Sequence, residues 1–138
     1  MTMSVGKSLA RLKTTSVVVA DANVPDEGGT ASIVMSFSDG TKLQVFYWRL
    51  IQDGRALLSS FDHQQKYGLP APINGKEQLA KILEGEICSD AQFDAETADL
   101  IFLFGKTTKL QIFNFTGYEI WDIRFPDGSG ELSNYALK

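Results

Sequence analysis

The stretch ASIVMSFSDGTKLQVFYW, residues Ala31–Trp48, is the clearest indication of the fold of this chain. Apolar residues alternate with polar residues on both sides of Asp39-Gly40, as a strand with one buried face requires. An Asp-Gly dipeptide is typical of a two-residue hairpin turn, because such turns need positive φ. The pattern predicts an antiparallel meander with strands over Ser32–Phe37, Thr41–Ile51 and, after a second turn at Asp53-Gly54, Arg55–Phe61.

The same pattern returns in the second half of the chain. TKLQVF at Thr41–Phe46 becomes TKLQIF at Thr108–Phe113, and the wider segment Ala31–Trp48 aligns with Ala98–Phe115. The matching positions are mainly the apolar residues that a sheet needs for packing. We therefore interpret the repeat as architecture and not as a binding motif.

Signals outside the meander complete the expected elements. Asn74 is a good N-cap for a helix over Lys76–Leu83, because Glu77 can complete a capping box. LARLKTTSV at Leu9–Val17 resembles LAKILEGEI at Leu79–Ile87, so each half is expected to begin with a short helix. The other expected elements are strands at Thr14–Val19, Asp99–Phe104, Thr108–Phe115 and Tyr118–Phe125, a weak strand or loop at Ile87–Ala95, a loop at Asp62–Gly75 and a short edge strand at Glu131–Leu137.

Together these elements predict a single α+β domain over residues 1–138. We expect a largely antiparallel sheet of about six to eight strands, with one or two helices packed on it. The halves of the internal pseudo-repeat cover approximately residues 9–61 and 79–137. Two copies are too few for a solenoid, which needs about three repeats.

Composition and charge restrict the class of partner. The net charge is −4 and the isoelectric point is about 4.9. We therefore expect a basic protein as the partner, and we do not expect nucleic acid as a ligand. Cys88 is the only cysteine, which excludes an internal disulfide and favours a reducing compartment. Because the sequence shows neither an apolar leader nor a membrane-length apolar stretch, we expect a cytoplasmic protein without membrane contact.

Residues suited to catalysis are few. His63 is the only histidine, and we interpret it as an exposed residue of a polar loop. Cys88 lies in an acidic stretch, which disfavours the reactive thiolate. One His and one Cys do not make a structural zinc site. The sequence therefore predicts no enzyme, no cofactor and no metal.

The most unusual feature is the run EGEICSDAQFDAETAD, residues Glu84–Asp99, which holds six acids and no base. This run is either a solvated connection between helix and sheet or a docking face for a basic protein, because charge of one sign at this density requires solvation or a partner. For the second interpretation the predicted contact residues are Glu84, Glu86, Asp90, Asp94, Glu96 and Asp99, with Glu119 and Asp122 behind them.

Aromatic residues offer a second class of contact. Trp121 alternates with Ile123 and Phe125, so core burial is expected for this face. If the sheet were open on one side, Tyr47, Trp48 or Trp121 would be candidates for binding hot spots.

The stretch DLIFLFGKTTKLQIFNFTGYEIWDIRFPDG, residues Asp99–Gly128, resembles a pattern in small bacterial immunity proteins of contact-dependent or polymorphic toxin systems, and in related uncharacterised bacterial families. An apolar strand is followed by a "KL-x-I-F" strand and a "YE-x-W-x-I" strand. The resemblance implies a protein that neutralises a toxin domain by occlusion, with the acidic residues directed at a basic cleft. It supplies no catalytic motif.

Two other classes stay open, and so does the oligomeric state. One is a structural or self-associating domain that pairs through a sheet edge such as Glu131–Leu137. The other is a small-ligand binder or enzyme, which needs a pocket lined by His63 and the Asp62–Gly75 loop.

Overall fold

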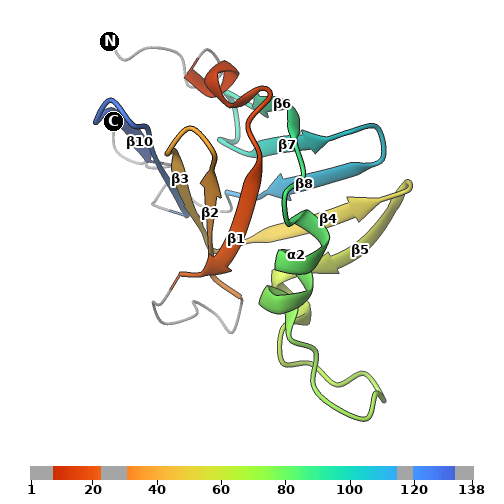
Figure 1. Ribbon diagram of the computed structural model, residues 1–138. Helices are drawn as coiled ribbons and strands as arrows, with labels where there is room; N and C mark the ends of the chain where they lie inside the picture. The colour runs from red at the N-terminus through yellow and green to blue at the C-terminus, as the bar shows by residue number, and fades with distance from the viewer. Residues whose placement is uncertain (1–7, 23–30, 115–119, 133–138) are drawn as a thin grey trace.

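The computed structural model of the 138-residue chain describes residues 8–22, 31–114 and 120–132. Over these residues Figure 1 shows a mainly β structure with one α-helix of more than two turns. The elements are η1 (Ala10–Leu12), β1 (Val17–Asp21), β2 (Ile33–Phe37), β3 (Lys42–Val45), β4 (Trp48–Gln52), β5 (Arg55–Ser59), η3 (Ser60–Asp62), α2 (Gly75–Leu83), β6 (Cys88–Phe93), β7 (Leu100–Phe104), β8 (Thr108–Ile112), β9 (Trp121–Arg124) and β10 (Gly130–Leu132).

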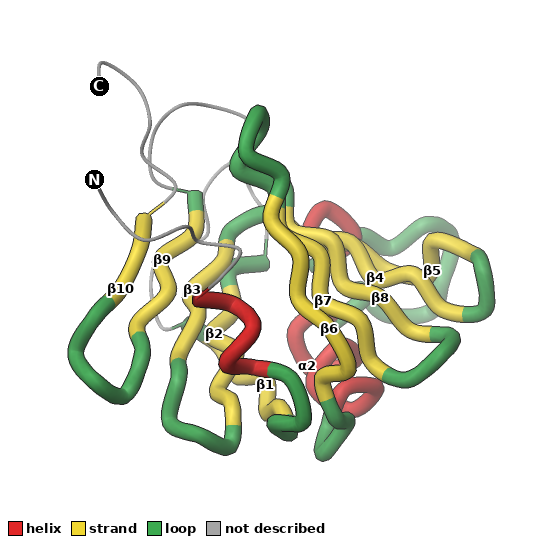
Figure 2. Tube along the Cα trace, turned by 90° about the horizontal axis from the view of Figure 1, so that it is seen from above, coloured by secondary structure: helices red, strands yellow, loops and turns green. Residues whose placement is uncertain are grey.

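The described strands form two antiparallel sheets of five strands each. Sheet 1 has the order β1-β2-β3-β9-β10 and sheet 2 the order β5-β4-β8-β7-β6. Figure 2 shows the sheets as two groups of strands that come near each other at β1 and β6. The α+β class with antiparallel strands is therefore confirmed, whereas the prediction of one sheet with about six to eight strands is wrong.

The chain leaves sheet 1 within a stretch that the sequence presents as one strand. Val45 is the last residue of β3 and pairs with Trp121, whereas Trp48 begins β4 and pairs with Ile112 in sheet 2. The predicted strand Thr41–Ile51 is thus two strands that belong to different sheets. The break at residues 46 and 47 shifts the alternation, so that Val45 and Trp48 are both buried.

The sequence repeat corresponds to a repeat of strand pairing. In sheet 1 Ile33 pairs with Val45, and in sheet 2 the aligned residues Leu100 and Ile112 pair in the same way. In each half the following hairpin belongs to the other sheet. The β4–β5 hairpin of the first half pairs with β8 in sheet 2, and the β9–β10 hairpin of the second half pairs with β3 in sheet 1. The two halves therefore exchange hairpins, and each sheet contains strands from both.

Two tryptophans occupy equivalent positions at these crossings. The indole Nε1–H of Trp48 donates to the Ala31 carbonyl at 2.8 Å, and that of Trp121 donates to the Ala98 carbonyl at 2.7 Å. Both tryptophan side chains are buried. Since Ala31 and Ala98 are aligned in the repeat, the same contact is built twice.

A short bridge between residues 14–17 and 85–88 joins the two halves. The Thr14 N–H donates to the Cys88 carbonyl at 2.8 Å, and the Gly85 N–H donates to the Val17 carbonyl at 3.1 Å. Thr14 and Gly85 both have φ of 72°, a conformation that favours glycine, and each begins one side of the bridge. The bridge therefore has the same twofold character as the sheets.

Helix α2 covers the edge of sheet 1 at β1. Its N-cap is Asn74, whose side chain accepts from the Glu77 N–H at 3.0 Å, as the sequence predicts. The buried side chains of Leu79 and Leu83 face the core, and Lys76 forms an ion pair of 3.0 Å with Asp21 of β1. The helix thus covers part of an edge strand that would otherwise be exposed.

The core lies between the inward faces of the two sheets. Phe37 of sheet 1 and Phe102 of sheet 2 approach with ring centroids 5.7 Å apart. The strand predicted at Glu131–Leu137 begins as β10 at the edge of sheet 1, and residues 133–137 lie outside the described part. In the part of the chain that the structure describes, no helix is long and apolar enough to cross a membrane.

Candidate functional site

The acidic run Glu84–Asp99 is divided by strand β6. Glu84 and Glu86 precede the strand, and Asp94, Glu96 and Asp99 follow it. A strand of six residues spans roughly 20 Å, so the two acidic groups lie at opposite ends of it. The structure brings together only the second group, which we call the acidic turn (residues 94–99).

Two predicted contact residues already have a cation beside them. Asp90 lies 3.6 Å from Lys13, and Asp122 lies 3.5 Å from Arg124. The Gln92 side-chain amide donates to Asp90 and, together with Lys13, holds the pKa of this carboxyl below its usual range. Asp122 belongs to β9 in sheet 1, and Glu119 lies outside the described residues.

The acidic turn is held by its own hydrogen bonds. Asp94 Oδ1 accepts from the Glu96 N–H at 2.9 Å, and the Asp94 carbonyl accepts from the Ala98 N–H at 2.8 Å. Thr97 Oγ1 accepts from the Asp99 N–H at 3.1 Å. Each bond fixes a backbone group, so the backbone of the turn and the Asp94 carboxylate have a defined position.

Asp99 connects the acidic turn to the end of β8. Its Oδ1 accepts from the Asn114 N–H at 2.7 Å, while the Asn114 side-chain amide donates to the Thr97 carbonyl at 3.1 Å. The buried Trp121 indole holds the same turn from below through Ala98. The turn is therefore anchored to both sheets.

A pocket of about 460 Å³ opens beside the acidic turn on sheet 2. Asp94 and Asp99 lie on one side of it, and the half-buried side chains of Phe93, Ile101 and Phe113 supply apolar walls. Such a site suits a long side chain with an apolar stem and a cationic head, because stem and head meet different parts of the wall.

Arg49 contacts two of the residues that line this pocket. Its guanidinium lies 4.9 Å from the centroid of the Phe113 ring, and its Nε–H donates to Gln111 Oε1 at 2.8 Å. This cation is directed at a ring and an amide, and the described residues place no ion-pair partner at Asp94, Glu96 or Asp99. The acidic turn therefore keeps its negative charge toward solvent.

The aromatic residues that an open sheet would expose are buried or half-buried. Trp48 and Trp121 are 1% exposed and belong to the core, so neither is a contact residue. Tyr47 is half-buried and stacks on Phe61, with ring centroids 5.6 Å apart and an interplanar angle of 15°. Phe61 is half-exposed, and nothing in the alternation of its neighbours marks it as a surface aromatic.

His63 is buried, so its interpretation as an exposed loop residue is wrong. Its Nδ1 accepts from the Gly75 N–H at 2.9 Å, which places the proton of the neutral ring on Nε2. A second pocket of about 430 Å³ contains His63, Asn74, Lys76 and Asp21. Because Nδ1 already accepts from the first turn of α2, His63 positions this helix and the loop before it.

Cys88 is buried in the core and its Sγ donates to the Asp90 carbonyl at 3.4 Å. Burial raises the pKa of this thiol to about 11, against the small lowering from that hydrogen bond. Within the described residues, no group of three or more His, Cys, Asp or Glu side chains is arranged to hold a metal ion.

Labelling of Cys88 provides a first prediction. Because its pKa rises from 9.0 to about 11, the thiolate population near neutral pH falls about a hundredfold. An aromatic disulfide reagent should therefore react at least about a hundredfold more slowly with the native chain than with the chain in urea. Equal rates would show that Cys88 is accessible in the native state.

Comparison of the chain with protein-family models, with curated proteins and with solved structures finds no match. The function is therefore argued from the geometry of the acidic turn and its pocket.

Proposed function

We propose that this chain is a cytoplasmic protein-binding protein of the immunity type, which neutralises a basic toxin domain by occluding it. The observation that carries the proposal is the pocket of about 460 Å³ beside the acidic turn, with Asp94 and Asp99 on its rim. The partner is a folded protein with lysine or arginine side chains around its own functional cleft.

The pocket suits a basic side chain of a partner for a geometric reason. One oxygen of Asp99 is held by the Asn114 N–H, so the carboxylate is oriented before any partner arrives. Preorganised groups lose little conformational entropy on binding. The methylenes of a lysine or arginine would cover Ile101 and Phe113, which are half-buried in the free chain.

Charge outside the pocket supports the same partner. Glu96 is exposed next to the pocket, and Glu84 and Glu86 are exposed at the other end of β6. Exposed charges of one sign accelerate the encounter with a partner of opposite sign, and salt weakens this effect. The residues at the pocket should determine affinity, and those at the distant end mainly the association rate.

Neutralising the acidic turn tests the proposal. The variant Asp94→Asn/Glu96→Gln/Asp99→Asn removes three charges but keeps an oxygen acceptor at each capping position. We expect its affinity for the basic toxin domain, which we expect an adjacent gene to encode, to fall about tenfold, because three rim charges at roughly 0.2–1 kcal/mol each contribute about 1–3 kcal/mol together. Titration calorimetry at two salt concentrations measures both the affinity and its salt dependence.

The matched control is Glu84→Gln/Glu86→Gln, which changes charge in the same acidic run at the opposite end of β6. Its equilibrium affinity should stay within about twofold of the parent chain. A parent chain that neither binds the toxin domain nor protects cells producing it would overturn the proposed function. Binding that the acidic-turn variant retains in full would exclude the pocket as the contact.

A further inference from the structure

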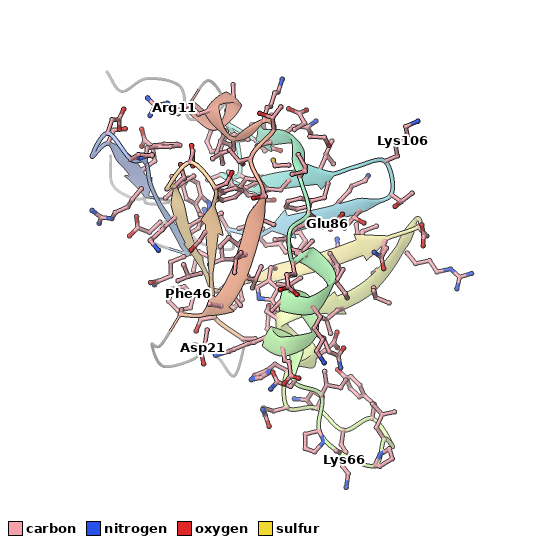
Figure 3. All side chains as sticks on the ribbon, viewed as in Figure 1. Arg11, Asp21, Phe46, Lys66, Glu86 and Lys106 are labelled. Carbon is pink, nitrogen blue, oxygen red and sulfur yellow. The ribbon has the colours of Figure 1, made fainter. Side chains whose placement is uncertain are left out.

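Residues 62–74, the projecting loop, extend away from both sheets. Figure 1 shows this loop beyond β5 and α2, and Figure 3 places Lys66 at its far end. Every residue from Gln64 to Pro72 is exposed. The loop therefore adds a convex element to the end of sheet 2.

The projecting loop is internally hydrogen-bonded along its length. The Gln64 N–H donates to the Ile73 carbonyl at 2.7 Å, and the Ile73 N–H donates to the Gln65 carbonyl at 2.8 Å. Nearer the tip, the Leu69 N–H donates to the Lys66 carbonyl at 2.7 Å. At the base, His63 accepts from the Gly75 N–H and fixes the loop to α2.

The projecting loop contains residues in a backbone conformation that most side chains avoid, one near its base and two at its tip. Gln64 has φ of 68° and Tyr67 has φ of 45°, and Gly68 follows with φ of 79°. Non-glycine residues at positive φ cost of order 1–3 kcal/mol and persist where the surroundings impose them. Here the hydrogen bonds within the loop impose these conformations and hold one loop shape.

The side chains at the tip are unusually apolar for such exposure. Tyr67 is 66% exposed and Leu69 is 47% exposed, while Phe61 at the base is 50% exposed. The Tyr67 hydroxyl donates to Asp62 Oδ1 at 2.9 Å, which restricts the ring. A fixed, exposed tyrosine presents a large contact area at low entropic cost, as binding hot spots do.

The projecting loop is continuous with the pocket at the acidic turn. Phe113 lines that pocket, and its N–H donates to the Tyr47 carbonyl at 3.0 Å. Tyr47 stacks on Phe61, and Phe61 leads into the loop. The loop follows β5 at one edge of sheet 2, and the acidic turn connects β6 and β7 at the other edge. Both leave the sheet at the same end of its strands, so a partner that spans the width of the sheet can meet both.

From this placement we infer that Tyr67 and Leu69 insert into an apolar cleft of the same basic toxin domain that the acidic turn contacts. The inference rests on the proposed function and names the element that enters the partner. The partner surface must be concave and apolar, because the tip is convex and apolar and the pocket beside it takes the basic groups.

The double variant Tyr67→Ala/Leu69→Ala tests this assignment in the full chain. Its affinity for the same basic toxin domain should fall about thirtyfold or more, because hot-spot truncations cost about 2 kcal/mol or more. The thermal midpoint should stay unchanged, since both side chains are largely exposed. Tyr67→Phe, which keeps the ring and loses only the hydroxyl, should retain most of the affinity.

Leu57→Ala is the matched control, because Leu57 is 53% exposed but lies on β5 outside the loop. It should leave the affinity within about twofold. If the loop variant binds as tightly as the parent while the acidic-turn variant is weakened, the insertion is overturned and the proposed function stands. A parent chain that does not bind the toxin domain overturns both.

Discussion

Trp48→Ala and Trp121→Ala are each expected to lower the free energy of unfolding by about 3–5 kcal/mol. Both indoles are 1% exposed, and each donates to the carbonyl of an alanine that begins a meander. Truncation leaves a large cavity and an unsatisfied buried carbonyl of Ala31 or Ala98. Urea denaturation followed by far-UV circular dichroism measures the loss.

Trp48→Phe and Trp121→Phe separate the two contributions. Phenylalanine fills most of the volume but cannot donate to the alanine carbonyl, so a cost of about 1–3 kcal/mol is expected from the lost partner. Because the contacts are equivalent in the repeat, both variants should show it. A loss below about 1 kcal/mol for either Trp→Ala variant would contradict its place in the core.

Phe102→Ala is expected to cost a similar 3–5 kcal/mol, because this residue joins the two sheets. Phe102 is fully buried at the centre of β7 and approaches Phe37 of the other sheet. Removal of the aromatic side chain should weaken the packing between the sheets. The backbone pairing of residue 102 with Leu110 within sheet 2 should remain. Chemical denaturation gives the free energy.

Leu103→Ala is the matched control, one position along the same strand and half-buried on the opposite face of sheet 2. Its expected cost is about 1 kcal/mol, from the smaller apolar area that it loses. If Leu103→Ala were as costly as Phe102→Ala, the outer face of sheet 2 would have to be covered. The ratio of the two effects therefore tests the two-sheet arrangement.

The residues that form local elements could be predicted from the sequence. Alternation at Ile33, Met35 and Phe37 predicts a strand with one buried face, and all three are buried. Asp53 and Gly54 both have positive φ, as their hairpin turn requires. These features follow from neighbours along the chain, so no tertiary information is needed.

The prediction of a single sheet is wrong, although the sequence contains a signal for the division into two sheets. Apolar residues hold one phase through Leu43 and Val45 and the opposite phase through Trp48 and Leu50. A strand alternates with a period of two, so a change of phase marks a break.

The candidate site depended more heavily on tertiary structure. The acidic run is evident from the sequence. Only the structure shows that Asp94 and Asp99 line one pocket, whereas Glu84 and Glu86 lie at the opposite end of β6. The exposure of Tyr67 at the loop tip likewise could not be predicted, because a loop has no periodic pattern of apolar residues.

The sequence alone therefore specified most of the strands and turns, the capped helix and the acidic composition, since each depends on residues close along the chain. The exception is Thr41–Ile51, where two strands replace the single expected strand. Tertiary structure decided which sheet each hairpin joins, which acids meet Phe113 and that His63 is buried. The physical reason is that these outcomes depend on pairing between distant segments, such as β4 with β8, which local propensity does not specify.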